Sequence, residues 1–212
     1  MKVKEVLEGE IAEIETNPRY VSFDYCYGYF QSNKGQLAGD NMEISCLRLW
    51  AYLASWGMMR NQKLLQNSNY KVLENTIITI EDIFRNSEEM PDIEEDERDD
   101  FVEKIGGLCE KIEKSFEATT VKPTDTLITK IILGVFGVFP ALDTNVTNAL
   151  KEIEGKRRRE RVFSFYQEHK DVLKEKNIPV KLFSGEDSNM KYPIARLIDM
   201  CYSLMVKKVI NN

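Results

Sequence analysis

Lys130 and Asp143 are the two residues whose types and spacing best suit chemistry in this sequence. Both lie in the segment TDTLITKIILGVFGVFPALDTNV, residues 124–146. Asp143 directly precedes a predicted helix through Val146 and Leu150, so its carboxylate is expected at the helix N-cap. The free amides and the positive end of the helix dipole stabilise an anion there, as a fixed catalytic carboxylate requires. The alternative is that Asp143 is only a capping residue.

The helix that must position Lys130 is predicted from its apolar spacing. Residues at i, i+3, i+4, i+7, i+8 and i+11 form one stripe that faces a core: Ile128, Ile131, Ile132, Val135, Phe136 and Phe139. Thr126, Lys130, Gly134 and Gly137 cluster on the opposite side, where the small residues would admit a closely approaching group. The helix is expected to stop before Pro140, because proline cannot continue the hydrogen-bond ladder.

The rest of the chain shows helical periodicity over residues 5–15, 44–59, 72–84 and 101–116, and again after Tyr192-Pro193. The segment 44–59 is apolar on nearly all sides, which predicts a central helix buried on most of its surface. Residues 185–189 are expected to form a polar loop, and no strand is predicted. The fold class is therefore all-α, with six to eight helices around a cleft. The 212 residues form a single domain with one core or two small lobes.

Aromatic and polar residues near the end of the 44–59 helix form the second candidate site. Trp56 offers a flat ring beside Arg60 and Asn61, which suits the edge of a planar ligand. The alternative is a helix C-terminus whose dipole favours Arg60 and whose Trp56 fills core. Tyr27 comes from an aromatic-rich stretch, RYVSFDYCYGYF, which is either core or a stacking surface at the rim of a cleft.

Charge is distributed unevenly along the chain. The net charge is −6, but residues 88–103 contain ten acids against Arg98 and carry −9, so the remainder carries +3. A basic cluster that includes Lys156, Arg157 and Arg158 follows Asp143 by one helix. It forms either a solvated helix start or a phosphate-binding surface. The acidic run forms a solvated loop or, alternatively, a surface for an interaction partner.

Several classes of protein are disfavoured by composition. Four scattered cysteines without a CxxC pair, and a single histidine, His169, match neither zinc nor iron-sulfur sites, so no metal and no cofactor are expected. No carboxylates are paired at ligand spacing, which argues against a metal-dependent nuclease. No run of 18 apolar residues and no hydrophobic signal core occur, so we expect a cytoplasmic protein that binds no membrane. The oligomeric state is not predicted.

The Lys130 helix followed by FPALDTNV resembles the helix-hairpin-helix DNA glycosylases, whose catalytic Asp opens a helix in a similar "D-T/S-x-V" setting. The resemblance implies that Asp143 is catalytic and that Lys130 lies near the lysine used by members with lyase activity. Two features differ from the family pattern. Val121-Lys122-Pro123-Thr124 replaces the Gly-rich hairpin, and only 13 residues separate Lys130 from Asp143.

The implied function is cleavage of the N-glycosidic bond of a modified or damaged base in double-stranded DNA, after extrusion of its nucleotide. Lys130 would contact phosphate or, less in keeping with its sequence surroundings, form a Schiff base; hydrolysis alone is thus favoured over an added lyase step. The remaining assignments place Trp56, Arg60, Asn61 and Tyr27 at the base, and Lys122, Lys156, Arg157 and Arg158 at the DNA backbone.

Two further stretches, YLASWGMMR and KYPIARLIDM, look like ones found in uncharacterised bacterial proteins, and this likeness implies a role in phage defence. A function from another class stays open beside the enzyme. The chain would then be a non-catalytic helical interaction protein of a defence or regulatory system, with the acidic run as its binding surface and Asp143 as a simple cap.

Overall fold

The computed structural model describes residues 3–5, 8, 19–59, 68–86, 90–150 and 155–210. Within these residues the chain is mostly helical, which confirms the all-α class. From Val21 onward, the described part of the chain contains α2 (Val21–Ser32), α3 (Met42–Ser55), α5 (Glu74–Arg85) and α6 (Arg98–Lys114). They are followed by α7 (Asp125–Phe136), α8 (Thr144–Ala149), α9 (Lys156–Lys174) and α10 (Ile194–Ile210). Short 3-10 helices η1 (Gly39–Asn41) and η2 (Tyr70–Leu73) precede α3 and α5.

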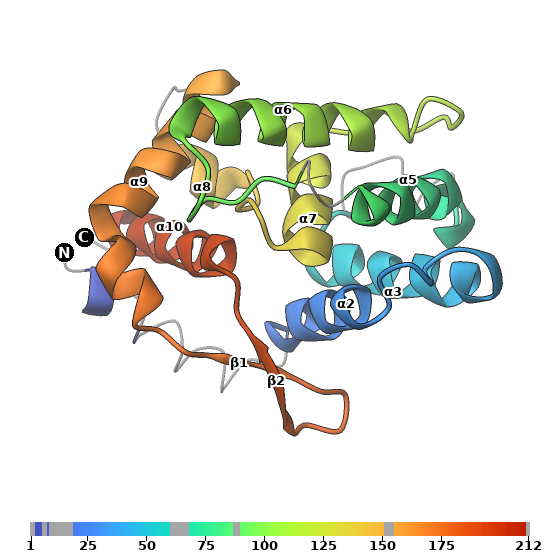
Figure 1. Cartoon of the computed structure of the whole chain (residues 1–212), viewed down its shortest axis with the longest axis horizontal. Helices are drawn as coiled ribbons and strands as arrows, with labels where there is room; N and C mark the ends of the chain where they lie inside the picture. The colour runs from blue at the N-terminus through green and yellow to red at the C-terminus, as the bar shows by residue number, and fades with distance from the viewer. Residues whose placement is uncertain are drawn as a thin grey trace.

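Helix α7 lies in the middle of the molecule (Figure 1), where it packs against α2, α3 and α6. Every residue from Leu127 to Phe136 is buried, so the helix has no free face. The expectation that its small-residue side admits a ligand is therefore wrong. A Cβ added at Gly134 would overlap the ring of Tyr52, which shows that the closely approaching group belongs to the protein's own core.

The end of α7 is set by Gly137 and lies four residues before Pro140. Gly137 has φ +70°, a left-handed conformation that glycine adopts without a Cβ clash, and its N–H bonds the carbonyls of Ile132 and Leu133. The expected stop before Pro140 is thus confirmed, but its cause is the glycine cap. The chain then turns through residues 138–143 into α8.

Helices α5, α6 and α10 coincide closely with the predicted segments, whereas α3 differs from its prediction. It ends at Ser55 instead of residue 59, and Ile44 and Leu47 on its outer side are 40% and 38% exposed. Burial on most sides was therefore wrong for α3, which buries one face through Cys46, Leu49 and Leu53. Most of the predicted helix at residues 5–15 lies outside the described residues.

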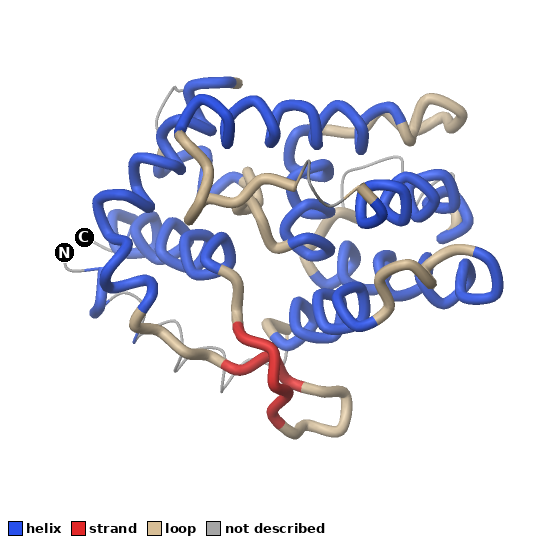
Figure 2. The backbone as a smooth tube through the Cα atoms, viewed as in Figure 1, coloured by secondary structure: helices blue, strands red, loops and turns tan. Residues whose placement is uncertain are grey.

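A small hairpin of two antiparallel strands, β1 (Pro179–Lys181) and β2 (Asp187–Lys191), lies at one edge of the helical body (Figure 2). The predicted polar loop at 185–189 therefore overlaps a strand. Buried Asp24 of α2 anchors the hairpin, accepting hydrogen bonds from the Lys181 N–H at 2.8 Å and the Tyr192 hydroxyl at 2.6 Å. This long-range contact explains why local periodicity did not reveal the strands.

The acidic segment is partly structured by lysines. Residues 90–97 form a loop, as expected, and the acids from Asp99 onward belong to α6. Asp96 pairs with Lys104 at 2.6 Å, and Glu94 pairs with Lys174 of α9 at 2.9 Å. The ion pair of Glu94 with Lys174 therefore connects the loop before α6 to α9. Within the described ranges, no helix is both long and apolar enough to cross a membrane.

Candidate functional site

The structure brings Lys130 and Asp143 together. Nζ of Lys130 lies 3.6 Å from Oδ2 of Asp143. The lysine side chain is 4% exposed and the carboxylate is 27% exposed, so the pair has a buried cationic end and an anionic end that solvent reaches. Solvent therefore reaches the carboxylate but not the amine.

The turn before Asp143 is held by hydrogen bonds to α7. Thr126 Oγ1 donates to the Leu142 carbonyl, and the Leu142 N–H donates to Thr129 Oγ1, both at 2.8 Å. Asp143 Oδ1 in turn accepts the Val146 N–H at 3.1 Å, which is the N-cap bond expected from the sequence. These bonds orient the Asp143 carboxylate so that its second oxygen, Oδ2, faces Lys130.

Lys130 lies in an apolar and aromatic environment. Its Nζ is 5.2 Å from the ring centroid of Trp56, within the range of a cation-π interaction. Burial lowers the pKa of Lys130, while the carboxylates of Asp143 and Asp199 act in the opposite direction. Such a buried position does not suit the phosphate contact predicted for Lys130.

The predicted base-binding residues are distributed differently from expectation. Trp56 caps the C-terminus of α3, and its ring is approached by Lys130 and also by Arg19 at 5.0 Å and Arg196 at 5.2 Å. Tyr27 stacks on Phe23 instead and packs against Gly137. Trp56 is therefore a member of the Lys130 site, whereas Tyr27 is part of the packing. Arg60 and Asn61 lie outside the described residues.

A second buried ion pair, Arg196 with Asp199, was missed by the sequence reading. Both are on α10, with Nη1 and Oδ2 2.7 Å apart and exposures of 2% and 7%. A signal for them was present: IARLIDMC places two opposite charges three residues apart in an otherwise apolar helix. Charges in such a setting are buried only when they are paired, so the pair itself could have been predicted.

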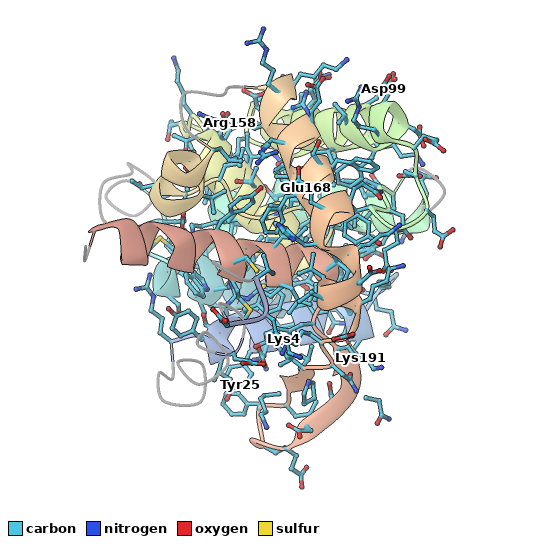
Figure 3. All side chains as sticks on the ribbon, turned by 90° about the vertical axis from the view of Figure 1, so that its left-hand side faces the viewer. Lys4, Tyr25, Asp99, Arg158, Glu168 and Lys191 are labelled. Atoms are coloured by element: carbon cyan, nitrogen blue, oxygen red, sulfur yellow. The ribbon has the colours of Figure 1, made fainter. Side chains whose placement is uncertain are left out.

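The predicted DNA-backbone residues lie near the start of α9 and before α7. Lys122, Lys156 and Arg157 are exposed, and Arg158 pairs with Asp125 of α7 at 3.7 Å. Arg158 lies on the upper part of the molecule in Figure 3, far along α9 from the hairpin region where Lys191 lies. A cavity of about 220 Å³ is lined by residues of both the basic helix and the Asp143 turn, including Arg159 and Leu142. The start of α9 therefore lies near Leu142, and the acids Glu110, Glu113 and Asp125 line the same cavity.

A larger cavity, of about 540 Å³, lies elsewhere, between α3 and η2. Asp40, Glu43 and Glu74 are among its lining residues, and neither Lys130 nor Asp143 is. Among the residues that the structure describes, no three His, Cys, Asp or Glu side chains are grouped so that they could hold a metal ion.

Comparison with known proteins identifies no family for this chain. The chain matches no protein-family model, and neither the curated proteins nor the solved structures contain a significant match.

Replacing Lys130 with Met should make the stability difference from the natural protein depend on pH. The folded pKa of Lys130 lies below its usual value of 10.5, so between these two pKa values the unfolded chain holds the proton more firmly. The natural protein should therefore gain stability relative to the Met variant as pH rises through this range, by about 1.4 kcal/mol per unit of pKa difference. Urea unfolding of both proteins at several pH values from 7 to 10.5 measures this, and a difference that stays constant over the whole range would contradict the lowered pKa of Lys130.

Proposed function

We propose that this protein is a DNA glycosylase-like enzyme that flips a modified or damaged base out of a duplex and hydrolyses its N-glycosidic bond. The observation that supports this most is the Asp143 carboxylate, which is fixed at the start of α8, 27% exposed, and 3.6 Å from a buried lysine. A fixed anion next to solvent suits a reaction in which positive charge develops on a sugar.

In the proposed reaction, Asp143 stabilises the oxocarbenium-like sugar as the base departs with the electrons of the glycosidic bond. Asp143 also orients a water molecule, and it takes a proton from this water as the oxygen bonds to C1′. The departing base gains a proton from solvent. Lys130 acts here as the positive partner that holds the carboxylate in place, so that no covalent intermediate is needed. Hydrolysis without a lyase step follows from that role.

Stacking within a duplex hides the sugar-base bond, so this chemistry requires extrusion of the nucleotide and a grip on the flanking phosphates. The exposed cations at the start of α9 are the proposed grip, because the cavity between Arg159 and Leu142 places this helix beside the Asp143 turn. The stretches YLASWGMMR and KYPIARLIDM, which look like ones found in uncharacterised bacterial proteins, add heavily modified phage DNA to damaged cellular DNA as a proposed substrate.

Replacing both Lys156 and Arg157 with Ala is expected to weaken DNA binding without changing the Asp143 site. Loss of two phosphate contacts should lower the slope of log affinity against log salt by about 1.8. Fluorescence anisotropy with a short duplex at several salt concentrations measures this. Lys170→Ala is the matched control, because Lys170 is exposed on the same helix, about four turns away. Equal losses in both proteins would contradict a localised grip.

The proposal is tested by incubating the protein with unmodified plasmid DNA and with heavily modified phage DNA, and then counting abasic sites with an aldehyde-reactive probe. Abasic sites on the phage DNA, formed in the presence of a chelator, are the expected result. Absence of abasic sites on both DNAs, together with tight binding of another protein, would instead favour the non-catalytic interaction protein, in which the pair of Lys130 and Asp143 only stabilises the turn.

A further inference from the structure

The ion pair of Arg196 and Asp199 is attached to the same turn as Asp143. While Asp199 Oδ2 binds Arg196, its Oδ1 accepts the N–H of Ala141 at 3.1 Å. Ala141 is two residues before Asp143, and the residue between them, Leu142, is the one held by the threonines of α7. One buried carboxylate on α10 therefore links a buried cation to the backbone that carries the candidate catalytic carboxylate.

Arg196 has few other means of satisfying its charge. Its guanidinium is 4.8 Å from the ring of Phe23 and 5.2 Å from that of Trp56, and its Nε and Nη2 are buried without hydrogen-bond partners. Asp199 is its ion-pair partner at 2.7 Å. Without that carboxylate, the guanidinium would lose its ion-pair partner in an interior that screens charge poorly.

Lys130 and Arg196 lie near the same aromatic ring. The Nζ of Lys130 and the guanidinium of Arg196 are each 5.2 Å from the ring centroid of Trp56. The charged groups acting on the lysine are Asp143 before α8 and the two α10 residues, Arg196 and Asp199. Among the described residues, Tyr52 of α3, Asp24 of α2 and Tyr192 before α10 also act on Arg196, and Arg19 lies 5.0 Å from the Trp56 ring. Removal of Asp199 alone would take away one of the two carboxylates that act on Lys130 and would leave Arg196 without its ion-pair partner.

We propose that Asp199 is a positioning residue whose carboxylate cancels the charge of Arg196 and so keeps Lys130 in its ammonium form, paired with Asp143. Its hydrogen bond to Ala141 holds this carboxylate against the Asp143 turn. The catalytic meaning of this role, an amine withheld from attack on the sugar, rests on the proposed function. Whether Lys130 carries its proton does not depend on the proposed function, and it is measured without any substrate.

The direction of the effect is fixed by electrostatics. Burial lowers the pKa of Lys130, Asp143 and Asp199 raise it, and Arg196 lowers it. Asp199→Asn keeps an oxygen for the Ala141 N–H but removes the negative charge, so the lysine should lose its proton at lower pH. Arg196→Gln removes the opposing positive charge, so the lysine should keep its proton to higher pH. The double variant removes both and should return the lysine towards its natural behaviour.

The test uses the full chain with lysine labelled with ¹³C at Cε, and the Cε shift of Lys130 is followed against pH by NMR. The Lys130→Arg variant, which lacks that signal, assigns it. Circular dichroism checks that each variant is folded. We expect the titration midpoint to fall by about one pH unit or more in Asp199→Asn, to rise in Arg196→Gln, and to lie near the natural value in the double variant.

An unchanged midpoint in Asp199→Asn, or a double variant shifted as far as the single one, would overturn the proposal. If Asp199→Asn does not fold, Arg196→Gln decides alone, and a fall in its midpoint would overturn the proposal. A protein that releases no base from any DNA would refute the proposed function while leaving this titration result intact.

Discussion

Replacing Asp143 with Asn is expected to lower base release by at least about 100-fold, the range typical for loss of a general base. Asn is as good an N-cap as Asp, so the bond to the Val146 N–H and the start of α8 should persist. DNA affinity should stay the same or rise, because an anion near the phosphates has been removed. Single-turnover base release and fluorescence anisotropy measure the two effects separately.

Asp125→Asn is the matched control for this substitution. Asp125 also lies at the start of a helix, its side chain is 73% exposed, and it pairs with Arg158 at 3.7 Å. It should release base at close to the natural rate, because its carboxylate does not meet Lys130. Equal activity in Asp143→Asn and Asp125→Asn would assign Asp143 the role of a cap only.

Replacing Gly137 with Ala should destabilise the protein by about 3 kcal/mol. The φ of +70° costs an L-residue about 1–2 kcal/mol, and overpacking in a core costs about 1–3 kcal/mol. An added Cβ would lie 2.6 Å from Pro193 and 2.7 Å from Tyr27, both of which are held by other helices or by the hairpin connection. Because Gly137 begins the turn to Asp143, base release should fall as well. Urea unfolding gives the free-energy change.

Two other glycines separate the causes of this loss. Gly35 has φ +80° with nothing within 4 Å of an added Cβ, so Gly35→Ala should show the conformational cost alone. Gly107 is exposed within α6 and also has free space, so Gly107→Ala should stabilise the protein by about 0.5–1 kcal/mol. If Gly137→Ala is no less stable than Gly35→Ala, the contacts with Pro193 and Tyr27 adjust without a measurable cost in stability.

The elements that could be predicted are those whose information is local. Apolar spacing identified α5, α6, α7 and α10, and the Asp before a short helix identified the cap at Asp143. The sequence marked Lys130 and Asp143 as separate candidates, but their contact at 3.6 Å was not predicted.

The features that escaped prediction depend on contacts between distant segments. The hairpin is anchored to Asp24, which precedes Lys181 by 157 residues, and no pattern within the hairpin encodes that bond. The small face of α7 suggested an open surface because a sequence cannot show that Tyr52 fills it. Arg196 and Asp199 were passed over because their helix was read by its apolar residues, although two opposite charges within an apolar stretch indicate a buried pair.

Free base in solution is the most direct measure of the central claim that the Asp143 carboxylate cleaves an N-glycosidic bond. Mass spectrometry of the supernatant, after incubation of the protein with modified phage DNA and a chelator, should find a single modified base in equal amount to the abasic sites formed. That base should be absent with Asp143→Asn and present with Asp125→Asn. Intact DNA with no released base, or release of nucleotides in place of bases, would contradict the account.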